Sequence, residues 1–188
     1  MNYRGKKITL RAIEQEDLKS LHRWSNDPEI NYQLGGWHFP SSLQDQQKWF
    51  ESLSVKSNDQ RFAIETKEDG LIGMANLVSV NWKDRNAFHG MLLGDTENRG
   101  KGYGVDTIMT LCKYAFEELG LRRLDTTIIE YNKASLGVYI DKCGWKEEGH
   151  KKNYYFRKNQ WWDQVIIGIT AEDYFSLTKK NGYWQNEE

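Results

Sequence analysis

The chain has 188 residues, the length of one domain of ordinary size, and enough to bury a core without disulfides or structural metals. Its 26 basic and 27 acidic residues leave a net charge of −1, so no domain-wide positive field exists to hold nucleic acid or an anionic membrane. Two cysteines are too few for a disulfide framework, and residues 1–11 contain no apolar run typical of a signal peptide. We therefore expect a single cytoplasmic domain over residues 1–188, without membrane or nucleic-acid partners.

Apolar spacing divides the chain into strands and helices, with a Gly- and aromatic-rich loop at residues 32–39. The strands are expected at 8–12, 61–66, 71–80, 86–93, 123–129, 145–156 and 161–170. The helices are expected at 14–26, from 40 to about 56, at 103–119, at 132–143 and, as a short final turn, at 171–177. Hairpins come first and helical crossovers later, which predicts a mixed α/β (α+β) sheet and not a doubly wound one.

The most informative segment is the glycine-rich loop at residues 94–104. Gly100, Gly102 and Gly104 alternate there, which lets backbone N–H groups point into one concavity at the start of the next helix. Such a site suits a pyrophosphate. The loop lacks the Gly-Lys-Ser/Thr of a Walker motif, because Lys101 precedes Gly102, and its spacing differs from the dinucleotide-binding fingerprint. A flexible surface loop is the alternative.

Two separated motifs carry a family resemblance. Residues 99–104 (Arg-Gly-Lys-Gly-Tyr-Gly) match the Arg/Gln-x-x-Gly-x-Gly/Ala loop of the GCN5-related N-acetyltransferase (GNAT) superfamily. Residues 132–145 resemble its Asn-x-x-Ser…Tyr-x-x-Lys-x-Gly-Phe segment, with Trp145 in place of Phe. The opening, at 8–11, 17–18 and 24–29, resembles the branch with ribosomal-protein, spermidine and amino-sugar-nucleotide acetyltransferases. The resemblance covers residues 7–170 and implies the GNAT fold, a mixed sheet with a splayed central strand pair flanked by helices.

The resemblance also implies acetyl-CoA as co-substrate, with no metal. Acetyl-CoA is expected between the strands at 86–93 and 123–129, paired with the backbone of the first and held by the glycine loop. Asn132 has two interpretations, a bond to the pantetheine arm or a helix N-cap, and Ser135 is a further candidate. The implied cofactor-binding residues are Met91, Leu92, Leu93, Arg99, Gly100, Lys101, Gly102, Tyr103, Gly104, Asn132 and Ser135.

Two residues are candidates for catalysis by direct attack of an amine on the thioester. Tyr139 lies two helical turns after Asn132, where many relatives carry the acid that protonates the leaving thiolate; the alternative is a tyrosine packed in the core. His89 falls where many relatives carry Glu as general base; the alternative is a satisfied histidine on a half-exposed strand.

Aromatic residues are expected to line the acceptor side. The candidates are Trp37, His38, Tyr154 and Trp162, and Asp163 is a possible partner for a cationic amine. No acidic cluster typical of a polyamine pocket appears near residues 32–39, which favours another small amine, such as an amino-sugar or its nucleotide conjugate; polyamines and antibiotics stay open. The alternatives are a protein N-terminal acetyltransferase, a non-catalytic acyl-CoA-binding module, and a homodimer interface as the use of the aromatic residues.

Overall fold

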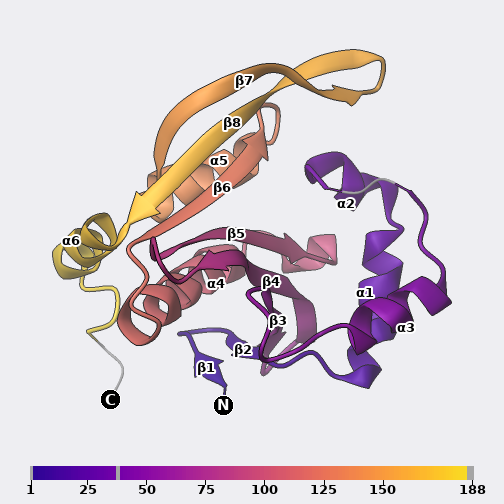
Figure 1. Ribbon diagram of the computed structural model, residues 1–188, viewed down its shortest axis with the longest axis horizontal. Coiled ribbons are helices and arrows are strands. Elements are labelled where there is room, and N and C mark those ends of the chain that lie inside the picture. Colours follow the sequence, from indigo (N-terminus) through magenta and orange to yellow (C-terminus); the bar gives the residue numbers. More distant parts are fainter. Residues whose placement is uncertain (1, 37–38, 186–188) are drawn as a thin grey trace.

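A computed structural model describes residues 2–36 and 39–185, and within them eight strands form one sheet in the order β1-β2-β3-β4-β5-β6-β8-β7 (Figure 1). The strands are β1 (Tyr3–Arg4), β2 (Thr9–Arg11), β3 (Gln60–Thr66), β4 (Gly70–Asn81), β5 (Asn86–Leu93), β6 (Arg123–Ile129), β7 (Lys146–Arg157) and β8 (Gln160–Thr170). Among these described strands β5 and β6 run parallel and every other neighbouring pair is antiparallel. The predicted mixed α/β sheet is confirmed.

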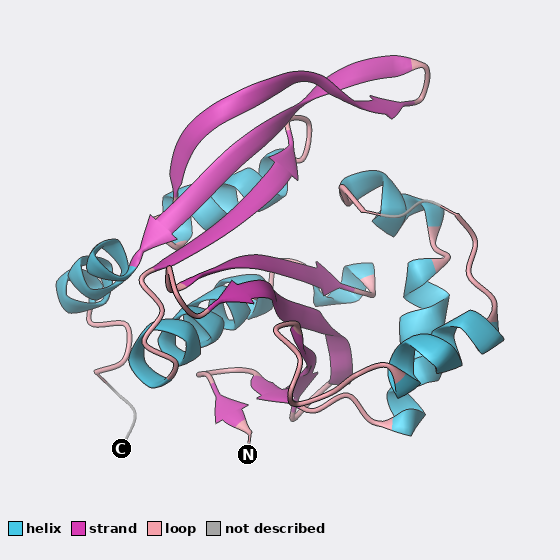
Figure 2. Cartoon of the chain, in the orientation of Figure 1, coloured by secondary structure: helices cyan, strands magenta, loops and turns pink. Residues whose placement is uncertain are grey.

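Helices cover both faces of this sheet. They are the 3₁₀ turns η1 (Gln15–Asp17) and η2 (Thr96–Asn98), the α-helices α1 (Leu18–Ser25), α2 (Pro28–Gln33), α3 (Leu43–Glu51), α4 (Tyr103–Lys113), α5 (Lys133–Leu136) and α6 (Ala171–Asn181), and the π-helical segments η3 (Tyr114–Glu118) and η4 (Gly137–Lys142). Figure 2 shows α1, α2 and α3 grouped at one end of the sheet and α4 lying along β5. None of the helices in the described ranges combines the length and apolar character that crossing a membrane requires.

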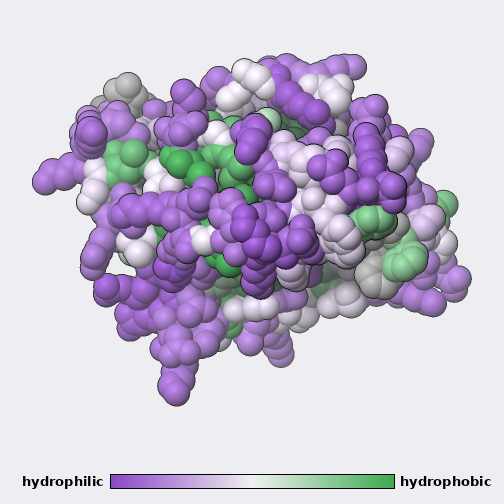
Figure 3. Space-filling view, turned by 90° about the horizontal axis from the view of Figure 1, so that it is seen from above, coloured by the Kyte–Doolittle hydropathy of each residue, from purple (hydrophilic) through white to green (hydrophobic). Residues whose placement is uncertain are grey.

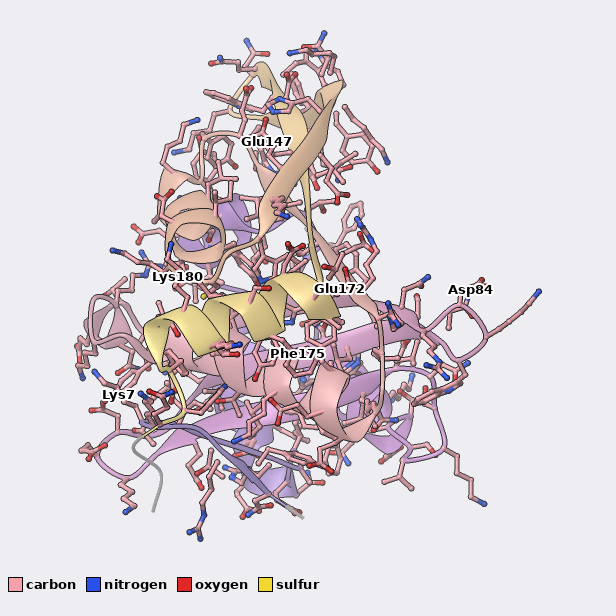
Figure 4. All side chains as sticks on the ribbon, turned by 90° about the vertical axis from the view of Figure 1, so that its left-hand side faces the viewer. Lys7, Asp84, Glu147, Glu172, Phe175 and Lys180 are labelled. Carbon is pink, nitrogen blue, oxygen red and sulfur yellow. The ribbon has the colours of Figure 1, made fainter. Side chains whose placement is uncertain are left out.

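The main core lies between the sheet and α4, η4 and α6. Fully buried Ile108, Leu111 and Leu124 belong to it, together with Trp145. The C-terminal helix α6 lies beside the helix formed by α4 and η3 (Figure 4). The rings of Phe116 in η3 and Tyr174 in α6 lie 5.5 Å apart. A second, smaller core lies under α1 and α2. Seen from the β7–β8 side, the surface is mostly hydrophilic, and hydrophobic residues appear only in separate patches (Figure 3).

Two contacts fix α4 and the glycine loop before it. The buried carboxylate of Asp106 accepts the backbone N–H groups of Lys6, Lys7 and Ile8, which ties the start of α4 to the N-terminal strands. At the start of the loop, a Cβ on Gly94 would lie 1.9 Å from the ring of Trp24, so only glycine fits beneath α1. The loop is therefore held in place from both ends.

The structure adds the short strand β1, which the sequence did not predict, and it differs from the predicted helices at several of their ends. The pair Asp27-Pro28, interpreted as a helix end, begins α2, because Asp27 accepts the N–H groups of Glu29 and Ile30 and Pro28 takes the first turn. The helices predicted at 103–119 and 132–143 start where expected and pass into π-helical turns. The helix predicted from 40 to about 56 is the shorter α3, and the helix predicted at 171–177 is the longer α6.

Candidate active site

The strands β5 and β6 pair at one end and part at the other. Their register joins Asn86 with Arg123, Ala87 with Leu124 and Phe88 with Asp125, and then stops. Each strand keeps its outer neighbour beyond that point, since β4 follows β5 to Leu93 and β8 follows β6 to Ile129. Both inner edges thus present backbone groups that no strand satisfies, an arrangement that can accept an extended ligand as an added strand.

A cavity of about 430 Å³ occupies this opening. Residues of α5 and η4 line it from one face of the sheet, among them Ser135 and Tyr139. Residues of β4, β7 and β8, including Asn76, Tyr155 and Gln164, line it from the other. The parting of the strands therefore joins two faces of the sheet in one cavity of ligand size.

Tyr139 is buried against this cavity, with 4% of its surface exposed. Its ring packs edge-on to Trp145 at 5.0 Å. Within residues 2–36 and 39–185 its hydroxyl has no hydrogen-bond partner. Burial, followed by the nearby Cys143 and Cys112, raises the pKa of Tyr139 well above 10, so the hydroxyl keeps its proton at neutral pH.

His89 lies on the core side of β5, not against the cavity. It is completely buried, its Nδ1 is 3.0 Å from the carbonyl oxygen of Asn76, and its ring packs on Tyr139 at 5.7 Å. Burial lowers the pKa of His89 from 6.5 to about 4. Of the β5 residues, Phe88, Gly90, Met91 and Leu92 line the cavity, whereas His89 is packed in the core behind Tyr139. This placement does not fit the general base expected from the resemblance.

Asn132 caps the helix that carries Ser135 and Tyr139. Its Oδ1 accepts the N–H of Ser135 at 3.1 Å, so the capping interpretation is confirmed. Its Nδ2 donates to the carbonyl of Gln33 at 3.1 Å, which joins α5 to the end of α2 beside the cavity. Asn132 and Ser135 both line the cavity.

The glycine loop at residues 99–104 leads into the N-terminus of α4, outside the cavity lining. Gly100 and Gly102 have φ angles of +77° and +85°, which other residues adopt at a cost, and a Cβ on Gly100 would meet nothing within 4 Å. Open backbone at a helix N-terminus suits a phosphate group. The side chain of Arg99 is exposed.

Two side chains of this loop share one partner. Lys101 Nζ forms an ion pair with Asp69 at 2.9 Å, and the hydroxyl of Tyr103 donates to the same carboxylate at 2.9 Å. The bond from Lys101 lowers the pKa of Asp69 below its usual value. Both side chains therefore hold the loop to the β3–β4 turn in this structure.

The three residues expected to pair with acetyl-CoA through their backbone lie at the end of β5. Met91 and Leu92 line the cavity, and Leu93 does not. A Cβ on Gly104 would lie 3.3 Å from Met91 and 3.7 Å from Leu93, so the start of α4 packs closely on this strand.

The four residues expected on the acceptor side differ in whether they line the cavity. Trp37 and His38 lie outside the described residues. Tyr154 lines the cavity and is 51% exposed. Trp162 does not line it; its ring packs on Tyr131 at 4.8 Å.

Asp163, the residue considered as a partner for a cationic amine, is already paired. Its carboxylate lies 2.6 Å from Lys152 Nζ and accepts the N–H of Asn153 at 3.0 Å. Lys152 lowers the pKa of Asp163. This carboxylate is not part of the cavity lining.

Three polar residues on the acceptor face of the cavity were not predicted from the sequence, namely Asn76, Thr127 and Gln164. Each is one polar residue within a strand. The only signal was their place on the parting strands or on the strands beside them, and that signal gives no side-chain direction by itself.

Comparison with known proteins gives consistent matches. A family model described as the acetyltransferase (GNAT) domain matches residues 7–146. The chain is 29% identical over 171 residues to an uncharacterized N-acetyltransferase, YokL, of Bacillus subtilis, covering 90% of this chain and 93% of the relative. It is 27% identical to the spermidine N(1)-acetyltransferase of Vibrio cholerae, covering 92% and 98%. The crystal structure of spermidine N-acetyltransferase from Vibrio cholerae in complex with CoA and spermine superposes with a TM-score of 0.82 at 25% identity, covering 90% and 98%.

Proposed function

Because the chain belongs to the GNAT acetyltransferase family, we propose that it transfers the acetyl group of acetyl-CoA to a primary amine of a small molecule. The observation that carries this proposal is the parting of β5 and β6 around a cavity lined from both faces of the sheet. Acetyl-CoA bound on one face of the sheet and an amine bound on the other can meet in this cavity. The similar structure from Vibrio cholerae was solved in complex with both CoA and an amine, spermine, which supports a site for both partners in this fold.

The donor side fits acetyl-CoA. The unpaired edge of β5 at Met91 and Leu92 offers backbone groups to an extended amide-containing arm. The positive-φ glycines Gly100 and Gly102, at the start of α4, offer backbone N–H groups and the helix dipole to the phosphates. When bound, acetyl-CoA supplies the thioester carbonyl that the amine attacks.

Tyr139 is proposed as the acid. As the amine nitrogen bonds to the carbonyl carbon and the C–S bond breaks, the sulfur becomes a thiolate that needs a proton. Tyr139 lines this cavity, its hydroxyl has no hydrogen-bond partner among the described residues, and it stays protonated because burial raises its pKa. It donates to the sulfur and is reprotonated from the attacking amine by way of solvent.

No base from the side chains is needed if the cavity itself favours the neutral amine. The residues that line it in the described part of the chain are uncharged, and burial without a carboxylate disfavours the ammonium form. A free alkylamine has a pKa near ~10, which desolvation lowers toward the working pH. His89 then serves in packing behind Tyr139.

The test combines binding and turnover. Acetyl-CoA at 100 times its Kd should stabilise the protein by about 2.7 kcal/mol in thermal unfolding. Release of the CoA thiol should follow with at least one amine from a panel of amino sugars, polyamines, monoamines and peptides with a free N-terminus. Stabilisation without thiol release would favour the acyl-CoA-binding module. Absence of both contradicts the proposed function.

A homodimer is proposed as a second use of the aromatic β7–β8 hairpin. Phe156 and Trp161 are 50% and 56% exposed at its tip and contact each other at 5.0 Å. Sedimentation at the monomer mass of 22.1 kDa would contradict self-association.

A further inference from the structure

The cavity between the parted strands carries no charge among its described lining residues, although 28% of the chain is Asp, Glu, Lys or Arg. Its polar groups are amides and hydroxyls. The carboxylate expected to attract a cation, Asp163, is paired with Lys152 outside the lining. As far as residues 2–36 and 39–185 form it, the acceptor face of the cavity is therefore polar and uncharged.

Gln164 on β8 contributes one amide. It is 5% exposed and lines the cavity. Its Nε2 donates to the hydroxyl of Tyr155 at 2.7 Å and to that of Thr127 at 3.3 Å. These two bonds direct Oε1 away from both hydroxyls, and within the described ranges this buried oxygen has no hydrogen-bond partner.

Asn76 on β4 contributes a second amide. It lies opposite Gly90 in the strand register, and a Cβ on Gly90 would come within 3.2 Å of both of its amide atoms. Its buried Oδ1 also lacks a partner among the residues that the structure describes. Gly90 thus packs directly against this amide, and any side chain at position 90 would press on it.

Two buried carbonyl oxygens without donors destabilise the protein, because they lost their bonds to water on folding. A ligand that brings N–H or O–H donors into the cavity removes that cost. An ammonium group that is not acetylated gains much less there, since a buried charge needs an opposite charge to offset its desolvation.

We propose that Asn76 and Gln164 form a neutral acceptor subsite, and that the acceptor is a monoamine whose other polar groups are uncharged hydroxyls or amides, as in an amino sugar, rather than a polyamine. This inference rests on the proposed function and narrows its substrate class. It distinguishes the chain from its relative that acts on spermidine.

The experiment measures CoA thiol release with glucosamine, as the hydroxylated monoamine, and with spermidine, as the polycation. We expect kcat/KM for glucosamine to exceed that for spermidine about tenfold or more. Thermal stabilisation by acetyl-CoA is measured on the same samples, so that a protein that fails to bind its donor is recognised.

Two variants place a carboxylate in the subsite. In Gln164→Glu the hydroxyls of Tyr155 and Thr127 can turn and donate to the new carboxylate, so the fold is retained. Asn76→Asp makes the same change from β4. Each should move the glucosamine-to-spermidine ratio of kcat/KM about tenfold toward spermidine. Gln160→Glu is the matched control: it adds the same charge to the same strand at an exposed position outside the cavity and should leave the ratio unchanged.

The outcomes separate the two proposals. A wild-type preference for spermidine, or equal shifts in Gln160→Glu and Gln164→Glu, overturns the neutral subsite and leaves the acetyltransferase intact. Turnover of peptides alone also overturns it. Failure to release thiol with any amine overturns the proposed function and the inference with it.

Discussion

The two ends of the β5–β6 pair belong to the same two strands, but they differ in strand pairing and in burial. At the closed end, Ala87 and Leu124 are paired and buried in the main core. At the open end, Met91 and Ile129 have no partner across the gap, and a cavity fills it. The closed end holds the two halves of the sheet together, and the open end exposes backbone and side-chain groups that a ligand can satisfy. Substitutions at the open end should therefore reduce activity, whereas those near the closed end should reduce stability.

Tyr139→Phe gives the largest expected effect at the open end. The change removes a hydroxyl that has no protein partner in the described structure, so the fold should keep its stability. Loss of the proton donor should lower kcat about 100-fold or more. Steady-state kinetics with acetyl-CoA and the preferred amine measure this, with thermal unfolding as the control for folding. An unchanged kcat would remove Tyr139 from the chemistry.

The pH dependence of stability tests His89, next to the closed end. Its pKa is about 4 in the folded protein against 6.5 in the unfolded chain, so the unfolded state binds the proton first as pH falls. The contribution is fully present above pH 6.5, is lost between pH 6.5 and 4, and amounts to about 3 kcal/mol. Urea unfolding across this window measures it.

His89→Gln is the matching variant, since it cannot titrate and still offers an N–H toward the carbonyl of Asn76. Its stability should vary less between pH 6.5 and 4 than that of the wild type. Activity at neutral pH should fall far less than in Tyr139→Phe. A loss of kcat as large as that of Tyr139→Phe, with acetyl-CoA binding intact, would restore the role of general base.

Substitutions of Gly102 and Gly120, which flank the helix formed by α4 and η3, distinguish a loss of acetyl-CoA binding from the general cost of backbone strain. Gly102→Ala and Gly120→Ala both place a side chain at positive φ, +85° and +66°, and each should cost about 1 kcal/mol of stability. Only Gly102 belongs to the proposed phosphate loop. KM for acetyl-CoA should rise in Gly102→Ala alone; a similar rise in both variants would make it an effect of lost stability.

Substitutions at Asn132 should have the smallest effect. Two variants separate the contributions of its two hydrogen bonds. Asn132→Ala removes the helix cap and should cost about 1 kcal/mol of stability. Asn132→Asp keeps the acceptor for the N–H of Ser135 and therefore the cap, but it replaces the donation to Gln33 by a contact between a carboxylate and a carbonyl oxygen, so it should cost less stability than Asn132→Ala only if the carboxylate turns away from Gln33. If KM for acetyl-CoA rises in Asn132→Asp, the link between α5 and α2 shapes the open end.

The sequence by itself determined the strands at 86–93 and 123–129, the start of α4 and the glycine loop, because each depends on local periodicity or on one turn conformation. The cap at Asn132 was one of two interpretations until the structure showed it. The sequence also carried the motifs of the family. It did not show that Asp27-Pro28 begins a helix, since the same pair also fits a helix end, and only packing of Ile30 in the second core decides between the two.

Tertiary structure alone decided which side chains reach the cavity. The side chain of His89 points into the main core. Residues of a strand alternate between the two faces of the sheet, and its position in the sequence did not show which face His89 takes. Asp163 loses its expected role because Lys152, on the neighbouring strand, pairs with it. Asn76 and Gln164 are far apart in the sequence and come to one cavity only because β5 and β6 part between their strands, and this long-range arrangement has no local signature.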